Sequence, residues 1–352
     1  MPTENHSQHS PSNRRAIAIF LGICAFVAIG VAGYALFARR ADVGGAAGGG
    51  ASVPVDPARL AQVRSAPHVM FRITTLGASY GRVGVVPADK PESPPQVAPL
   101  LCDRVYASAT NGLCLQASRG VLTTYRAVAF DGSFSEQHQF TLAGAPSRTR
   151  VARTAPLAAS TVFVSGDSYA AGGFSTRTTI FDLRTNSVIG DLETFTVMRD
   201  GQPFKRQDFN FWGVTFKDDG DHFFATLGSG GVLHLVEGAI STRTMNVVGA
   251  DVECPSLSPD GTRLVYKARM VEGGRVVWRL RIRDIATGAI TAVNETRNVD
   301  DQAEWLDDQN VLYALPREGM GSGSSDVWSA RADGTGNPRI FIPDAFSPAV
   351  VR

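Results

Sequence analysis

The sequence predicts an all-β protein, a six-bladed β-propeller preceded by one transmembrane helix. Three observations lead to this expectation. Beyond residue 66 apolar residues recur with the period of two that is typical of strands, the strand-like segments fall into groups of four, and the groups recur about every 45–50 residues. Thirty-six glycines and nineteen prolines supply the many turns that such a chain needs.

The clearest four-stranded unit covers residues 251–296. Its strands read VECPSLS, TRLVYKARM, VVWRLRIRDI and AITAVNE, with turns at 259–261 (PDG) and 286–288 (ATG). Asp-Gly and Asn-Gly pairs favour tight turns because positive φ angles cost these residues least. Similar units begin at DRVYAS, RTRVART, DFNFWGVTF and DDQAEWL, which gives five complete units. Within these units, SVIGDLETFTV is expected to be one strand and Asn111-Gly112 to be a hairpin turn.

A sixth unit is predicted to draw on both ends of the repeat region. Residues 68–101 supply only three strands, and DAFSPAVVR (344–352) matches the missing first strand. A sheet built from the two segments would close the ring and remove the open edges that promote aggregation. The sequence therefore predicts a closure in which one C-terminal strand joins three N-terminal ones.

The N-terminal part contains a long apolar segment. Residues 16–38 carry no charge and are flanked by arginine pairs at 14–15 and 39–40, and a helix of this length spans the roughly 30 Å hydrocarbon core of a bilayer. A cleaved signal peptide is the alternative, although its apolar region usually runs only about 7–15 residues. We expect a disordered tail (1–15), a transmembrane helix (16–38), a Gly/Ala-rich linker (39–65) and the propeller (66–352). The flanking charges do not decide the orientation, and we place the propeller on the extracytoplasmic side because the fold is usually found there.

The run from Leu257 to Tyr266 (LSPDGTRLVY) carries a family resemblance. It resembles the repeat of the WD40-like (PD40) propellers found in TolB, and residues 66–352 resemble uncharacterised actinobacterial proteins described as TolB-like. The resemblance implies a propeller that binds partners in the cell envelope. The chain differs from TolB in lacking a separate N-terminal α/β domain and in having the apolar segment, so no binding residue is carried over.

Composition and motifs exclude several functions. With 34 basic and 33 acidic side chains, the chain lacks the basic surface that nucleic-acid binding needs. The glycine-rich segments at 228–231 and 319–325 are interpreted as turns and not as phosphate-binding loops, since no helix follows them.

Acidic residues recur near the predicted starts of the first strands, which line the central channel of a propeller. A ring of carboxylates is a site that Ca²⁺ would favour, and the alternative is that these acids cap loops and face solvent. Only Arg150 is expected to oppose them. The candidate metal-ligating residues are Asp103, Asp208, Glu253, Asp300, Asp301 and Asp344, near which Asp251 also lies.

Cys102 and Cys114 flank the expected Asn-Gly turn and are candidates for a disulfide outside the cell, which would leave Cys254 free. Two hypotheses of function remain open. The first is a non-catalytic binding or scaffold module for a protein, peptide or envelope component, without a cofactor. The alternative is a Ca²⁺-dependent hydrolase such as a lactonase or esterase.

Overall fold

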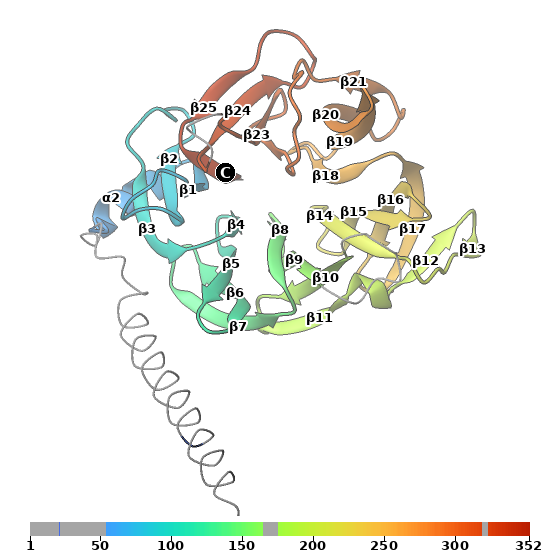
Figure 1. Ribbon diagram of the computed structural model, residues 1–352, viewed down its shortest axis with the longest axis horizontal. Helices are drawn as coiled ribbons and strands as arrows, with labels where there is room; N and C mark the ends of the chain where they lie inside the picture. Colours follow the sequence, from blue (N-terminus) through green and yellow to red (C-terminus); the bar gives the residue numbers. More distant parts are fainter. Residues whose placement is uncertain (1–20, 22–53, 165–174, 319–322) are drawn as a thin grey trace, which may run out of the picture. The chain divides into compact units, whose positions relative to one another are not determined.

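The computed structural model describes residues 21, 54–164, 175–318 and 323–352, and these form six β-sheets arranged around a common centre (Figure 1). The predicted six-bladed β-propeller is therefore confirmed. The expected tail, the transmembrane helix and the first part of the linker lie outside the described residues, apart from Leu21. Among the residues that are described, no helix is both long and apolar enough to cross a bilayer.

The first sheet joins the two ends of the propeller sequence, as predicted. Strand β26 (Ala345–Val351) pairs antiparallel with β1 (His68–Ile73), with His68 opposite Val351 and Ile73 opposite Ala345. Strands β2 (Arg82–Pro87) and β3 (Gln96–Leu101) complete the sheet. The short helix α2 (Pro57–Arg64) precedes it, and the Asp56 side chain caps this helix by accepting a hydrogen bond from the backbone N–H of Arg59 at 3.0 Å.

Four more sheets follow the expected pattern of four antiparallel strands. Their strands are β4 (Arg104–Ala107), β5 (Asn111–Arg119), β6 (Thr123–Asp131) and β7 (Glu136–Leu142); β8 (Ala145–Val151), β9 (Leu157–Val164), β10 (Ser175–Asp182) and β11 (Ser187–Asp191); β18 (Glu253–Leu257), β19 (Arg263–Glu272), β20 (Arg275–Asp284) and β21 (Ile290–Ala292); and β22 (Glu304–Trp305), β23 (Asn310–Pro316), β24 (Ser325–Arg331) and β25 (Arg339–Ile342). The first strands β4, β8 and β18 lie innermost, nearest the centre of the ring (Figure 1).

The remaining sheet has six strands, which differs from the expectation. After β11 the chain makes a 3₁₀ turn (Leu192–Thr194) and crosses to the next sheet, where it forms β12 (Thr196–Arg199) and β13 (Gln202–Pro203). Strand β12 runs parallel to β17 (Thr244–Ala250), which follows β14 (Asn210–Phe216), β15 (His222–Ser229) and β16 (Val232–Ala239). The expectation that SVIGDLETFTV is one strand is wrong. Leu192, Phe195 and Val197 are buried in a core to which both sheets contribute, and this burial favours the crossing of the chain between them.

The Asn111-Gly112 pair also differs from the expectation, because both residues lie in β5 and the turn precedes them. The backbone N–H of Ser108 donates to the carbonyl of Asn111 at 2.8 Å, so the chain reverses over residues 108–111. Gly112 has a packing role instead, since a Cβ there would lie 2.0 Å from the ring of Phe130. Glycine is required here by the close approach of an aromatic ring rather than by a turn.

The apolar cores lie within and between neighbouring sheets, and the largest completely buried side chains include Trp305, Tyr313, Phe71 and Phe181. This apolar interior holds the innermost strands in place. Their polar side chains meet near the centre of the ring and form the group of charges described next.

Candidate functional site

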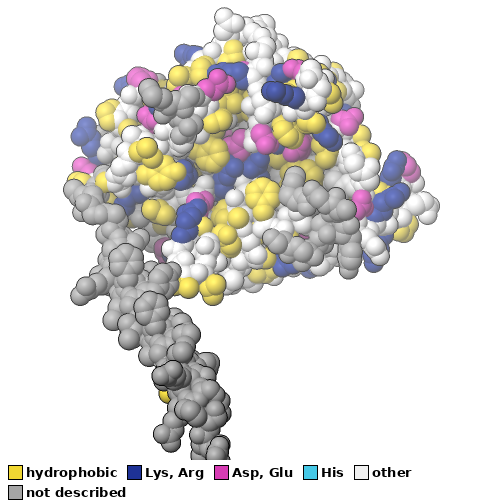
Figure 2. All heavy atoms as spheres, in the orientation of Figure 1, with side chains coloured by type: hydrophobic (Ala, Val, Ile, Leu, Met, Phe, Trp, Pro, Cys, Tyr) yellow, Lys and Arg dark blue, Asp and Glu magenta, His cyan; other side chains and the backbone are white. Residues whose placement is uncertain are grey.

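Charged side chains of both signs gather where the innermost strands converge, and Figure 2 shows basic and acidic groups together near the centre of the face in view. Four cationic side chains contact four carboxylates in this region. The cations are Arg104 on β4, Arg148 and Arg150 on β8 and Lys267 on β19, and the carboxylates are Glu253, Asp300, Asp301 and Glu304. We call this group the channel network.

Asp301 lies between two arginines from different sheets. Its Oδ1 accepts from Nη1 of Arg104 at 2.8 Å and lies 3.7 Å from Nη1 of Arg148. The three side chains are largely buried, with Asp301 5% exposed. Burial alone would raise the pKa of the Asp301 carboxyl, but the charges of the two arginines hold this pKa below its usual range. Asp301 is thus an anion that binds two sheets to a third.

Glu304 forms a second buried centre in the same segment. Its Oε2 lies 3.1 Å from Nη1 of Arg150 and accepts a hydrogen bond from the hydroxyl of Tyr106 at 2.9 Å. The guanidinium of Arg150 also covers the Tyr106 ring and donates to the carbonyl of Ala303 at 2.6 Å. Burial and the neighbouring carboxylate of Glu304 raise the pKa of Tyr106, so this hydroxyl is a hydrogen-bond donor and not a base.

Lys267 is the third buried charge, with its side chain 1% exposed. Its Nζ lies 2.9 Å from Glu253 and 2.5 Å from Asp300. The indole N–H of Trp278 donates to the other oxygen of Glu253 at 2.6 Å. Glu253 therefore has partners on both oxygens, and it shares the ammonium group of Lys267 with Asp300.

The other three predicted acids hold turns and loops in place. Asp103 accepts from the backbone N–H of Ala117 at 2.7 Å, and Asp208 accepts from the N–H of Gly230 at 2.6 Å and from the Ser229 hydroxyl at 2.8 Å. Asp344 lies 2.8 Å from Nη1 of Arg317. Within the part of the chain that the structure describes, no three His, Cys, Asp or Glu side chains are placed to hold a metal ion.

The expectation that Arg150 is the only cation facing these acids is therefore wrong. The sequence contained a signal for two further arginines. Arg148 shares a face with Arg150, because side chains two apart in a strand point the same way, and Arg104 directly follows the candidate acid Asp103. Calcium binding stays a prediction, but each candidate carboxylate already has a cation or an N–H group as its partner.

This pairing gives a direct test of calcium binding. The melting temperature of the full chain, purified in detergent, is expected to be the same in millimolar calcium and in excess chelator, because only an ion that binds the folded state raises the melting temperature. Differential scanning fluorimetry measures both conditions. A rise of several degrees in calcium, lost in an Asp301→Asn variant, would show that the acids form a cation site after all.

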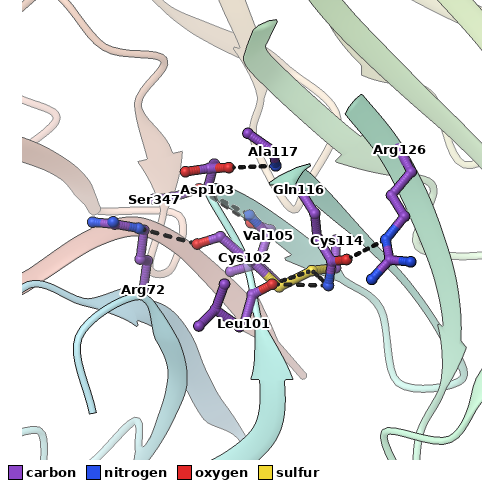
Figure 3. The surroundings of a disulfide bond; sticks show 10 residues. All are labelled: Arg72, Leu101, Cys102, Asp103, Val105, Cys114, Gln116, Ala117, Arg126 and Ser347. Carbon is purple, nitrogen blue, oxygen red and sulfur yellow. Dashed lines mark hydrogen bonds between the residues drawn. A yellow bond between two sulfur atoms is a disulfide. The ribbon is translucent and has the colours of Figure 1, made fainter. Parts of the chain in front are cut away.

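The two cysteines predicted to pair form a disulfide between the segment before β4 and strand β5 (Figure 3). The Cα atoms of Cys102 and Cys114 are 5.4 Å apart, and Cys114 lies opposite Val105 rather than near residue 109 as a two-residue turn would require. Arg72 donates to the carbonyl of Cys102 at 3.0 Å, which ties the bond to β1. Cys254 is a free and buried thiol whose pKa is raised by burial, so it is a poor nucleophile.

Two cavities flank the β12–β13 hairpin that sequence reasoning missed, each of about 630–660 Å³. Phe204 lines both of them. The second cavity is bordered by Arg199 and Arg206 of the hairpin and by residues 247–250 of β17. Only the unexpected crossing of the chain into the six-stranded sheet creates these spaces, so no local motif could have indicated them.

No family model matches the chain, and no curated protein does either. Solved structures do match. TolB from Acinetobacter baumannii has a TM-score of 0.54 at 17% identity, covering 81% of this chain and 67% of that one, and a chain of a nidogen/laminin complex has a TM-score of 0.50 at 10% identity, covering 81% and 98%. At these identities the likeness concerns the fold. The chain is an all-β six-bladed propeller whose fold is that of the TolB-like structures.

Proposed function

We propose that this chain is a membrane-tethered, extracytoplasmic propeller that acts as a non-catalytic binding or scaffold module for a protein, peptide or envelope component. The proposal concerns one face of the ring, here called the mouth face. It is the face on which the innermost strands begin and on which the second strand of each sheet turns into the third.

The distribution of exposed apolar side chains carries the proposal. Among residues 54–119, 123–164, 175–318 and 323–352, eight of the large hydrophobic side chains that are exposed lie on the mouth face and three on the opposite face. Leu76 and Val271 are 78% and 71% exposed at the tips of two different hairpins or loops. Exposed apolar groups concentrated on one face are typical of a surface that binds a partner. The mouth-face residues are Leu76, Tyr80, Leu101, Phe163, Val232, Val248, Val271 and Val276, and those opposite are Val188, Ile290 and Ile340.

The channel network argues against catalysis at the channel. A general base needs a lone pair that can reach a substrate, whereas Glu304 already accepts from Tyr106 and faces Arg150. Asp301 Oδ1 faces two arginines, and the side chain of Asp301 is only 5% exposed. These groups connect sheets to one another, which makes the frame rigid, and a rigid frame that carries loops is the usual basis of recognition by propellers.

Two features support the location. The apolar segment 16–38 is long enough to anchor the chain, and the disulfide between Cys102 and Cys114 is of the kind that persists outside the reducing cytoplasm. The resemblance of residues 257–266 to the TolB-like repeat implies partners in the cell envelope, and the nidogen/laminin structure contains a similar propeller in a protein complex.

Site-specific photo-crosslinking in cells tests the proposal. A photoreactive amino acid at Leu76 or Val271 on the mouth face is expected to give discrete adducts with a partner. The same amino acid at Val188 or Ile290, which are also exposed but lie on the opposite face, is the matched control and should give none. Adducts only from the opposite face, or none from any position, would count against a binding role for the mouth face.

A further inference from the structure

Strand β17 has an open edge beside the second cavity. On one side β17 pairs with β16 from Thr244 opposite Ala239 to Ala250 opposite His234, with a β-bulge at Val248, which has no partner on β16. On the other side it pairs with β12 only over residues 244–246, after which β12 turns away into β13. Within the described part of the chain, no strand covers residues 247–250 on that side. Four residues of β17 therefore present an unpaired strand edge.

The cavity of about 660 Å³ lies along this edge and has room for an extended chain. Its far wall is the β12–β13 hairpin with Phe204, and its end is the β15–β16 turn at 229–231. Asp208 fixes that turn by accepting hydrogen bonds from Ser229 and Gly230, so the turn is a firm boundary. Val248 is 41% exposed beside the edge. An open edge, an aromatic wall and a fixed end make a groove that we call the β17 groove.

Two arginines line the Phe204 wall of the β17 groove. The guanidinium carbons of Arg199 and Arg206 lie 5.5 and 5.8 Å from the centroid of the Phe204 ring. Asp200 is 3.6 Å from Arg199 with its side chain 91% exposed, and such an exposed pair contributes little. Asp208 lies at the end of the groove, where both of its oxygens accept hydrogen bonds from the turn at 229–230. A third arginine approaches from the neighbouring sheet, since a Cβ on Gly249 would lie 3.8 Å from the guanidinium carbon of Arg283.

We infer that residues 247–250 bind an extended acidic peptide, which adds as a strand to the open edge of β17. This inference rests on the proposed binding function and names the class of partner. The backbone of the peptide pairs with the edge, as in other cases of strand addition, and alternate side chains point to the two sides. Carboxylates on one side meet Arg199 and Arg206, while an apolar side chain packs on Phe204.

Fluorescence anisotropy with a labelled peptide in which glutamate alternates with valine tests the inference on the full chain in detergent. We expect saturable binding that weakens at least about tenfold in an Arg199→Ala, Arg206→Ala double variant, because about 1.4 kcal/mol of lost interaction corresponds to a tenfold change. Arg275→Ala, an exposed arginine at the β19–β20 hairpin, is the matched control and should bind like the parent. Unchanged melting temperatures show that the variants are folded.

Two further peptides separate strand addition from simple charge attraction. A peptide with lysine in place of glutamate, and an acidic peptide N-methylated at alternate backbone positions, are both expected to bind at least tenfold more weakly. Hydrogen exchange should show that the acidic peptide protects amides at 247–250. The inference would be overturned if the methylated peptide bound equally well or if the arginine substitutions had no effect. It would also be overturned if protection appeared elsewhere on the propeller, or if the chain associated with itself through this edge. Crosslinks from Leu76 and Val271 do not depend on this groove, so the proposed function can survive such a result.

Discussion

Replacing Asp301 with asparagine is expected to destabilise the propeller by about 3–5 kcal/mol, the cost of removing one partner from a buried ion pair. The substitution leaves the side chains of Arg104 and Arg148, 14% and 12% exposed, without their shared carboxylate. For a domain of this size the melting temperature should fall by on the order of 10 °C, measured by circular dichroism or scanning fluorimetry.

The neighbouring residue provides the control. Asp300 also contacts a buried cation, but its side chain is 55% exposed and Lys267 keeps Glu253 as a second partner. Asp300→Asn should therefore cost no more than about 1 kcal/mol. Equal and small effects of the two substitutions would show that the two arginines are hydrated or paired elsewhere, and the description of the channel network as a structural element would fail.

The same carboxylate makes stability depend on pH in a definite direction. Although burial opposes ionisation, Arg104 and Arg148 lower the pKa of Asp301 in the folded chain below its ordinary value of 3.8. A depressed carboxyl pKa contributes stability that is present above the unfolded pKa and is lost as pH falls through the folded one. Unfolding should thus become easier below about pH 4, and the Asp301→Asn variant should lose less stability over that range than the parent.

The architecture could be predicted because it depends on local features that repeat. Period-two alternation identifies strands, and the turn at Asp260-Gly261 has a local cause: Asp260 accepts from the N–H of Thr262, and Gly261 has a φ of 70°. The ring closure followed from arithmetic, since three strands at one end required a fourth from the other. The first signal is carried by neighbouring residues, and the second by the number of strands at each end of the repeat region.

The pairing in the channel network could not be predicted, because its contacts join residues far apart in sequence, although Arg104 and Arg148 could have been recognised as cations near the strand starts. Arg104 and Asp301 are 197 residues apart, and only the radial arrangement of the sheets brings them within 2.8 Å. A run of acids near strand starts looks the same whether the opposing strands supply more acids or arginines. Composition gave a hint, since nearly equal numbers of basic and acidic residues make pairing more probable than an acid ring.

The β17 groove was missed for a different reason. Residues 187–197 (SVIGDLETFTV) are rich in β-branched and apolar side chains, which is typical of a strand. Leu192 and Phe195 are buried in a core to which both neighbouring sheets contribute, so a tertiary preference decides the local structure. An insertion of this kind is visible only once both sheets are in place.

Loss of the disulfide is expected to cost the propeller about 3 kcal/mol, from the loop-closure entropy of a bond between cysteines 12 apart in sequence. In scanning fluorimetry, a reductant strong enough to open the buried bond should lower the melting temperature of the parent chain. It should leave the already lowered melting temperature of a Cys102→Ala, Cys114→Ala double variant unchanged. Cys254→Ala, which keeps the bond, is the matched control and should respond to reductant like the parent.

The bond also reports the compartment in which the propeller folds. If cells are trapped with an alkylating agent and the chain is then unfolded without reductant, two of its four cysteines should be alkylated, because the other two are bonded. Four alkylated cysteines would mean that the propeller matured in a reducing compartment, where such bonds do not persist. The extracytoplasmic location would then lose its chemical support, even though the apolar segment 16–38 would still be long enough to span a bilayer. Two alkylated cysteines would place the mouth face and its exposed apolar tips where an envelope partner could reach them.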